Sequence, residues 1–257
     1  MSSKFDTFRA LHQSDNLFVL PNAWDARSAL LFQEQQFPAV ATSSAAVAGS
    51  LGYEDGEGMP FHEYLFVIKR MLSTVQIPLS VDMEMGYGAS GEEILHHVRM
   101  LAKLGVAGIN LEDSLINTSG RMLNDADAFA RTIAFLRHNL LHEKLQIFIN
   151  VRCDTFILNV DNKQEETIQR IKKYEMAGAD GIFLPCISEE DDIALAVGHS
   201  SLPLNVMCIP GLPDFDTLNK LGVKRASMGP FLFSKVYDNA ARLSREIVYG
   251  KSFSPVI

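Results

Sequence analysis

Two short stretches of the chain place carboxylates at the end of apolar runs. The first, SVDMEMGYG, carries Asp82 and Glu84, and the second, GINLEDS, carries Glu112 and Asp113. Each apolar run is typical of a buried β-strand, and the ends of such strands are where α/β barrels carry their reactive groups. These acids are therefore the first candidates for chemistry.

The spacing of three of these acids predicts a cation site. Asp82 and Glu84 are two residues apart, so in extended backbone they point to the same side, and Glu112 on the next strand can approach them. Carboxylates this close repel one another unless they take up protons or surround a cation. Oxygen ligands without His or thiolate favour Mg²⁺, or Mn²⁺ in its place. Helix capping or pairing with Lys and Arg is the alternative for these acids.

Arg152 and a run of small residues are candidates for binding an anion. Arg152 ends the apolar run QIFINVR, where its guanidinium could hold a substrate carboxylate in bidentate fashion. A structural ion pair with Asp154 or Glu112 is the alternative. The small run can expose consecutive backbone N–H groups to an anion, although tight packing explains it equally well, and it includes Ser43, Ser44 and Ala45.

The elements that must position these residues alternate regularly along the chain. Three helix-to-strand joints, KLGVAGINLEDS, MAGADGIFLPC and KLGVKRASMG, repeat a helix that ends at glycine shortly before a strand. Apolar runs predict eight strands, at residues 17–20, 38–43, 77–83, 106–112, 146–152, 180–186, 203–209 and 224–229. Eight strand and helix pairs predict an α/β fold, a (β/α)8 barrel of the TIM type, as one domain over residues 1–257.

Composition narrows the classes of partner. The net charge of −8 and the absence of a Lys/Arg block exclude an electrostatic basis for binding nucleic acid or an anionic membrane, so we expect a small-molecule partner. No apolar stretch reaches the length of a membrane span, and the start lacks a secretory signal, so we expect a cytoplasmic protein. The three cysteines have no CxxC spacing, which argues against disulfides or structural zinc.

Six motifs in order resemble one known superfamily over nearly the whole chain. LPNAWDARSA, TSSAAVAGSLGYEDGE, SVDMEMGYG, GVAGINLEDS, NVRCDTF and GADGIFLPC are similar to the isocitrate lyase and phosphoenolpyruvate mutase superfamily, especially its small bacterial members of the carboxyvinyl-carboxyphosphonate phosphorylmutase and methylisocitrate lyase types. The resemblance implies a (β/α)8 barrel whose last helix is exchanged between subunits, giving a homodimer or homotetramer. It also implies Mg²⁺-dependent chemistry on a 2-oxo or 2-hydroxy carboxylate through an enolpyruvate-like oxyanion.

The resemblance also implies roles for individual residues. Asp82 would bind the metal, with Glu84 and Glu112 acting through its waters and Asp55 lying beside it. Arg152 would bind the substrate carboxylate and oxyanion, while Ser43 and the amides of Ser44 and Ala45 would hold the other end. The residues expected to contribute to catalysis are Arg152, Asp55 and Glu112.

Two departures from the family pattern affect the expected reaction. The usual Asp-Ala-Asp is Asp82-Met83-Glu84 here, and the loop SLINTSGRMLND lacks the Cys, Lys and His of isocitrate and methylisocitrate lyases. An isocitrate or methylisocitrate lyase is therefore not expected. Asn117 and Arg121 could in part replace the Lys and Asn that phosphonopyruvate-handling members carry in this loop. The general acid or base is unassigned, and its candidates are Asp55, Tyr53 and Arg121.

Three hypotheses of function follow. The first is a Mg²⁺-dependent lyase that cleaves a C–C bond of a small 2-hydroxy or 2-oxo carboxylate by retro-aldol or decarboxylative chemistry. The second is a phosphonomutase or phosphonopyruvate hydrolase acting on a C–P bond. The third is a keto-acid binding protein that has kept the pocket and lost the loop chemistry.

Overall fold

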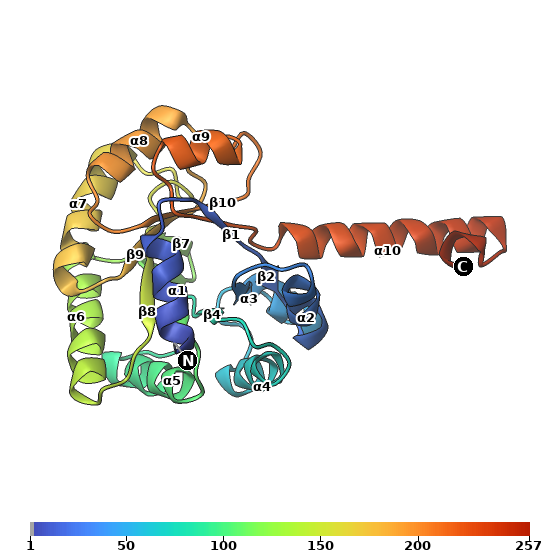
Figure 1. Cartoon of the computed structure of the whole chain (residues 1–257), viewed down its shortest axis with the longest axis horizontal. Coiled ribbons are helices and arrows are strands. Elements are labelled where there is room, and N and C mark those ends of the chain that lie inside the picture. The colour runs from blue at the N-terminus through green and yellow to red at the C-terminus, as the bar shows by residue number, and fades with distance from the viewer. Residues whose placement is uncertain (1–2) are drawn as a thin grey trace.

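The computed structural model describes residues 3–257 and contains a barrel of parallel strands surrounded by helices (Figure 1). Within these residues the main sheet has nine strands, in the order β1-β11-β10-β9-β8-β5-β4-β3-β2. They are β1 (Phe18–Leu20), β2 (Asn22–Ala23), β3 (Val40–Thr42), β4 (Leu79–Asp82), β5 (Gly108–Glu112), β8 (Phe148–Arg152), β9 (Gly181–Leu184), β10 (Leu204–Met207) and β11 (Arg225–Ser227).

The barrel closes through the chain segment that contains β1 and β2. These two short strands flank Pro21, whose missing N–H interrupts the ladder. β1 pairs in parallel with β11, while β2 pairs in parallel with β3 at the other edge of the sheet. With β1 and β2 counted as one broken strand, the predicted (β/α)8 barrel is confirmed, and each predicted strand contains an observed one.

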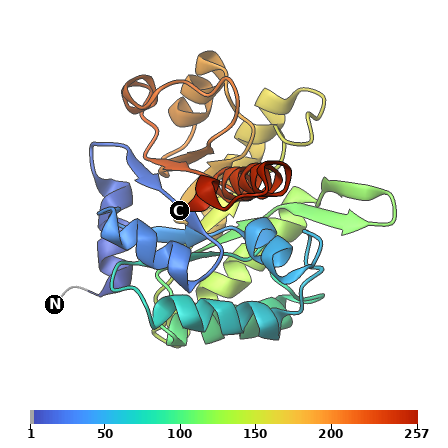
Figure 2. The ribbon, with the colours of Figure 1, turned by 90° about the vertical axis from the view of Figure 1, so that its right-hand side faces the viewer.

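Helices follow the strands around the outside of the barrel, as Figure 2 shows in the view along the last helix. The small residues that follow the second predicted strand form a helix, which the sequence did not predict. The helices are α1 (Lys4–Gln13), α2 (Ala26–Glu34), α3 (Ser44–Leu51), α4 (Phe61–Leu72), α5 (Gly91–Lys103), α6 (Ala126–His142), α7 (Lys163–Ala177), α8 (Glu190–Gly198), α9 (Phe215–Lys220) and α10 (Phe231–Gly250), with a 3₁₀ turn, η1 (Ser254–Val256).

Local sequence signals explain where several helices begin and end. Ser90 and Glu93 form a capping box at the start of α5, each side chain accepting from the other's backbone N–H. The glycines of the three repeated joints, Gly105, Gly178 and Gly222, all have φ between 85° and 97°. That left-handed conformation ends a helix without a steric cost only at glycine, so the repeat is a real structural joint.

The N-terminal helix α1 closes the bottom of the barrel. Its Phe8 and His12 are buried among Phe18 and Phe148, which point into the barrel from β1 and β8. The His12 ring stacks on Phe148 at a centroid distance of 4.1 Å, and Phe8 meets both phenylalanines edge-on. This aromatic plug fills the barrel interior at the α1 end, so a site inside the barrel has to open at the carboxyl ends of the strands.

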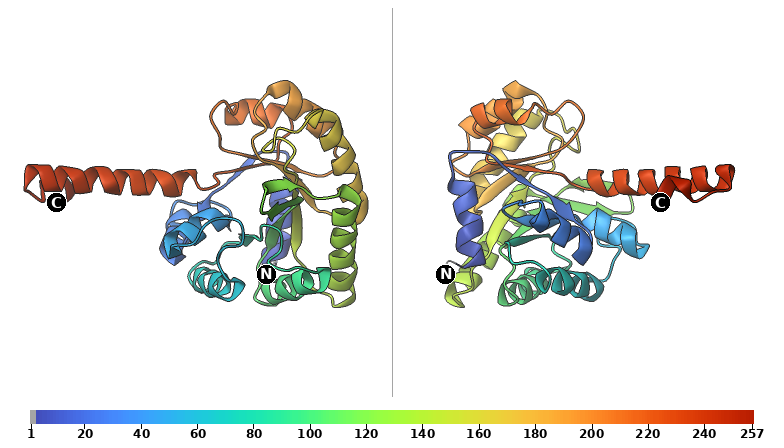
Figure 3. Two further views of the ribbon diagram at one scale, coloured as in Figure 1. Left: turned by 180° about the vertical axis from the view of Figure 1, so that it is seen from behind. Right: turned by 45° about the vertical axis from the view of Figure 1, so that its right-hand side comes forward.

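Two elements project from the barrel. An antiparallel hairpin, β6 (Ser114–Asn117) and β7 (Gly120–Leu123), occupies the loop after β5. Helix α10 extends away from the body, as all views in Figures 1 and 3 show, and no residue of this fully described helix is buried. Among residues 3–257, no helix has both the length and the apolar character required to cross a bilayer.

Candidate active site

A cavity of about 170 Å³ opens at the carboxyl ends of the barrel strands. It is lined by six of the residues predicted from the sequence: Ser43, Ser44, Ala45, Asp55, Asp82 and Arg152. The rest of its wall comes from other strand ends and their loops, namely Asn22, Asn110, Ile157, Phe183, Pro185, Met207, Ser227, Gly229 and Pro230. A cavity of this size suits a small acid of a few carbons.

The N-terminus of α3 forms one wall of the cavity. Ser43 is its N-cap and accepts a hydrogen bond from the Ala46 N–H, at 3.3 Å. The hydroxyl of Ser44 donates to Asp82 at 2.8 Å, so it orients that carboxylate rather than pointing freely into the cavity. The amide of Ala45, in the first turn, has no partner within the helix, and the positive end of the helix dipole favours an anion here. The predicted nest of amides is thus a helix N-terminus.

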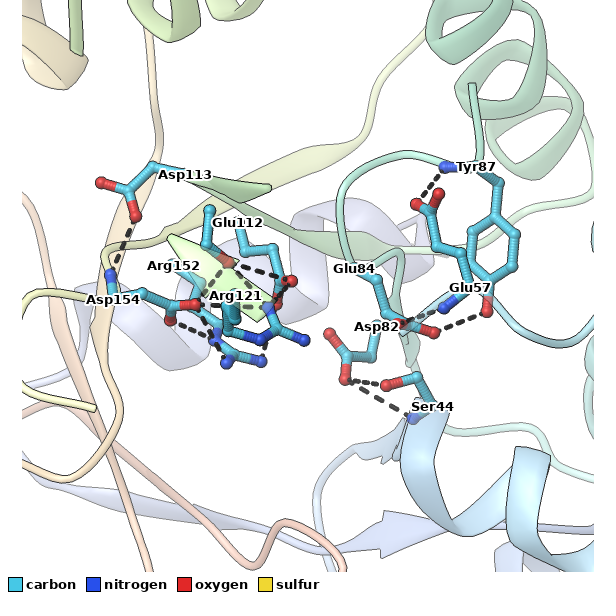
Figure 4. Close-up of polar contacts among 11 residues, drawn as sticks. Ser44, Glu57, Asp82, Glu84, Tyr87, Glu112, Asp113, Arg121, Arg152 and Asp154 are labelled. Carbon is cyan, nitrogen blue, oxygen red and sulfur yellow. Dashed lines mark hydrogen bonds and ion pairs between the residues drawn. The ribbon is translucent and has the colours of Figure 1, made fainter. Parts of the chain in front are cut away.

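Glu84 does not project beside Asp82 as the strand alternation predicted. Strand β4 ends at Asp82, and Glu84 has φ 48°, so the backbone between them is not extended. Glu84 is 2% exposed, and its carboxylate accepts hydrogen bonds from the Glu57 N–H (2.8 Å) and the Tyr87 hydroxyl (2.7 Å). Glu84 is not among the residues that line the cavity, and its carboxylate contacts Glu57 and Tyr87 (Figure 4).

Glu112 is held by two arginines. Arg152 Nη1 lies 2.7 Å from Glu112 Oε2, and Arg121 from strand β7 forms an ion pair with the other carboxylate oxygen. Asp154 shares both arginines, with Arg152 Nε at 2.6 Å and Arg121 Nη1 at 3.4 Å (Figure 4). The alternative given for Arg152, a structural ion pair with Asp154 or Glu112, is therefore present. Arg152 also lines the cavity.

The carboxylates perturb one another's titration. Burial, with further contributions from Asp82, Asp55 and Glu112, raises the pKa of Glu84 to about 8. Burial, followed by the charge of Asp82, raises the pKa of Asp55. Burial raises the pKa of Glu112 to about 7, although Arg152 and Arg121 act in the opposite direction. The site holds more negative charge than its arginines neutralise, which is the condition that a bound cation relieves.

The arrangement fits a cation held largely through water. Within residues 3–257, no three His, Cys, Asp or Glu side chains converge closely enough to hold a metal ion by themselves. Asp82 and Asp55 line the cavity, whereas Glu84 and Glu112 do not. Mg²⁺ is commonly bound by one or two carboxylates and several waters, so this donor set suits it.

The remaining candidates for acid or base lie at different distances from the cavity. Tyr53 donates to Glu63 at 2.9 Å and Asn117 is at the exposed tip of the hairpin, so neither lines the cavity. Arg121 reaches the site through Glu112. Asp55 is the candidate that faces the cavity with a raised pKa.

Asn110 was missed by the sequence reasoning, although a signal was present. It is a buried polar residue in the middle of β5 and lines the cavity. Three strands carry Asn at the same kind of position, in GINLE, FINVR and LNVM. A polar residue repeated within buried strands indicates a polar barrel interior, because an unpartnered amide there would be costly.

Comparison with known proteins gives one consistent result. Residues 8–248 match the phosphoenolpyruvate phosphomutase family. The chain is 35% identical over 245 residues to an uncharacterized protein of Mycobacterium tuberculosis H37Rv, covering 95% of this chain and 90% of that one. It is 28% identical over 222 residues to oxaloacetate decarboxylase 1 of Pseudomonas fluorescens Pf0-1, covering 84% and 75%. A proposed phosphonomutase from Burkholderia cenocepacia J2315 has a crystal structure that matches with a TM-score of 0.89 at 34% identity, covering 95% of this chain and 100% of that one.

Proposed function

Since the chain belongs to the phosphoenolpyruvate phosphomutase family, within the isocitrate lyase and phosphoenolpyruvate mutase superfamily, we propose that it is a Mg²⁺-dependent lyase that decarboxylates a small 2-oxo dicarboxylate such as oxaloacetate. The observation that carries this proposal is the composition of the cavity wall. It combines an arginine and a helix N-terminus, which bind carboxylates, with acids that suit a cation, and it contains no Cys, His or Lys among the described residues.

Arg152 and α3 divide the recognition of the substrate between them. Arg152 would donate to the carboxylate next to the 2-oxo group, since its fork of N–H donors matches a carboxylate in geometry and charge. Burial opposes the charge of Arg152, but Glu112, Asp154 and Asp82 outweigh it and raise its pKa, so the guanidinium stays charged. The Ala45 amide at the start of α3 would receive the other end of the substrate.

The cavity wall favours decarboxylation over retro-aldol cleavage. A retro-aldol step begins with removal of the 2-hydroxyl proton and needs a positioned base. The loop SLINTSGRMLND lacks the Cys that serves the related lyases as acid or base. Loss of CO₂ from a 2-oxo dicarboxylate needs no such base, because the electrons of the broken C–C bond pass into the carbonyl and form an enolate. Asp55 then lies in the cavity as the group that can return a proton to carbon.

Asp82 is the residue that would hold the metal directly, with Glu84 and Glu112 acting through its waters and Asp55 lying beside it. When bound, the cation would supply positive charge beside the oxygen on which the enolate charge grows. Ser44 fixes the Asp82 carboxylate through its hydroxyl, and Glu57 and Tyr87 do the same for Glu84. These contacts hold the acids in place without the metal.

The test is release of pyruvate and CO₂ from oxaloacetate by the purified protein with Mg²⁺. Metal ions alone decarboxylate oxaloacetate slowly, so the matched control is the Arg152→Lys variant at the same Mg²⁺ concentration. We expect saturable turnover that the variant largely loses. Turnover confined to 2-methylmalate-type hydroxy acids would refute the decarboxylase assignment in favour of retro-aldol cleavage.

Chemistry on a C–P bond is the second candidate, supported by the 34% identity to the proposed phosphonomutase. It would use the same cavity, with a phosphonate at the N-terminus of α3. Release of phosphate from phosphonopyruvate, or its conversion to phosphoenolpyruvate, without turnover of oxaloacetate would establish it. Tight binding of oxalate with no turnover of any of these acids would instead indicate a binding protein.

We also propose that α10 crosses to a second copy of the chain. An apolar cavity of about 590 Å³ lies over the outer faces of β1 and β11, where Val19 and Ala226 point outward and a helix following β11 would otherwise pack. The first residues of the chain's own α10 line one side of this cavity, but the helix then extends away from it and exposes Val236, Tyr237 and Val248. The exposed apolar residues of a partner's α10 would suit this apolar cavity. We therefore expect the intact protein to sediment as a dimer or tetramer.

A further inference from the structure

The middle of the barrel contains a buried polar cluster beneath the cavity. Its members come from five strands and point inward, between the aromatic plug of α1 and the residues of the cavity wall. They are Ser80, Asn110, Asn150, Asn205 and Arg225, each 5% exposed or less. Of these residues only Asn110 lines the cavity in which the proposed decarboxylation would take place.

Arg225 is the least satisfied member of this cluster. It is fully buried, and its guanidinium makes no ion pair with any described residue. One donor is used, from Nη2 to Asn110 Oδ1 at 3.2 Å, while Nε and Nη1 have no hydrogen-bond partner among residues 3–257. A buried charge with so few partners lowers the stability of the fold. A function for its contact with Asn110 would explain why this arginine is present.

The Arg225 contact fixes which way the Asn110 amide faces. A guanidinium can only donate, so the oxygen of Asn110 must point down toward Arg225. Asn150 also donates to that oxygen, at 2.9 Å. Asn110 lines the cavity, and with its oxygen held from below, its NH₂ group is the part presented to the cavity. Strand pairing sets Asn110 level with Asp82, the predicted metal ligand.

Resting on the proposed function, we infer that Asn110 is a substrate-binding residue that donates a hydrogen bond to an oxygen of the planar 2-oxo acid, and that Arg225 is the positioning residue that holds it. The cavity then has three kinds of donor for one small anion: Arg152, the N-terminus of α3 and the Asn110 amide. Without Arg225, Asn150 alone holds the oxygen of this amide. The amide is then less firmly fixed, and in the orientation that turns its oxygen toward the substrate it would repel the anion rather than bind it.

The experiment measures oxalate binding by calorimetry at saturating Mg²⁺, together with the thermal midpoint of the protein without ligand. Arg225→Met removes the guanidinium and keeps most of its volume. Asn110→Ala removes the amide itself. Ser80→Ala is the matched control, because Ser80 is in the same buried cluster and its hydroxyl has no described hydrogen-bond partner.

We expect Arg225→Met and Asn110→Ala each to weaken oxalate binding about 10- to 100-fold, the effect of losing one hydrogen bond to an anion, with Ser80→Ala unchanged. The thermal midpoint of Arg225→Met should hold or rise, since apolar residues can replace buried charges without loss of stability. A structural role alone predicts the reverse pattern, a lower midpoint with unchanged affinity, and that result overturns the inference.

A third variant and the wild type keep the outcomes separate. If Arg225→Met does not fold, Asn110→Ala decides, and unchanged oxalate affinity in that variant overturns the role of Asn110. Arg225→Lys, which keeps a donor, should recover part of the lost affinity. A wild-type protein that binds no oxalate refutes the proposed function itself, whereas binding by the wild type with unaffected variants refutes only this inference.

Discussion

His12, in the aromatic plug at the bottom of the barrel, should make the stability of the protein depend on pH. Its Nδ1 lies 2.9 Å from the Phe8 carbonyl oxygen and must therefore carry the hydrogen, while Nε2 is buried without a described partner. Burial, followed by the charge of Arg225, lowers the pKa of His12 to about 3. Protonation of Nε2 would bury an unpaired charge against Phe148.

The magnitude follows from the two pKa values. In the unfolded chain His12 binds a proton below about pH 6.5, whereas in the folded protein it stays neutral down to about pH 3. Between these values the unfolded state binds more protons, so stability falls as the pH falls. At pH 5 the difference of 1.5 pH units from the unfolded pKa corresponds to about 2 kcal/mol of lost stability.

Urea unfolding of the wild type and His12→Phe at pH 7.5 and pH 5.0 measures this loss. The variant keeps an aromatic ring on Phe148 without a titrating group, so its free energy of unfolding should fall by about 2 kcal/mol less over this interval. Phe18→Leu is the control, because it disturbs the same plug and should lower stability equally at both pH values. Equal pH dependence in the wild type and His12→Phe would refute the reasoning.

Four further outcomes are expected. Asp82→Ala should abolish Mg²⁺-dependent oxalate binding and leave the urea midpoint nearly unchanged, and retained binding with unaltered metal dependence would remove the metal assignment. Arg152→Lys should lower kcat/KM for oxaloacetate about 100-fold, because the bidentate contact is lost while the charge remains, and a change below threefold would contradict its role. Arg121→Leu should destabilise the protein by about 3 kcal/mol in urea unfolding, since buried Glu112 loses one of its two cationic partners; no change would show that Arg152 suffices. A chain ending at residue 230 should sediment as a monomer, and an unchanged oligomer would rule out exchange of α10.

The barrel could be predicted from the sequence because its signals are local. Apolar runs of strand length and glycines at helix ends depend on a few neighbouring residues, and the structure follows them at Gly105, Gly178 and Gly222. The helix α3 was missed because its small residues SAAVAGSL lack the apolar periodicity that marks a helix on a surface. The hairpin β6–β7 was also read as a loop, although its residues pair from Ser114 to Leu123.

Six of the candidate residues line one cavity as predicted, whereas Glu84 and Glu112 do not line it and Asn110 was missed. Residues at strand ends converge by topology alone, so Ser43, Asp82 and Arg152 were found. The direction of Glu84 was wrong because strand alternation applies only while the backbone is extended, and its φ is 48°. The arginine pairing of Glu112 depends on the hairpin that carries Arg121, and no short-range pattern in the sequence indicates it.

The closure of the barrel has a consequence during synthesis of the protein. β1 pairs with β11, with Phe18 opposite Arg225. During translation, β1 therefore has no partner at this edge until the residues of β11 have left the ribosome. For most of translation the nascent chain therefore has an unpaired, apolar strand edge. Such an edge can pair with β-strands of other molecules and so lead to aggregation. Cells producing this protein from slowly translated messages should accumulate more aggregate, and early chaperone binding would be expected to relieve it.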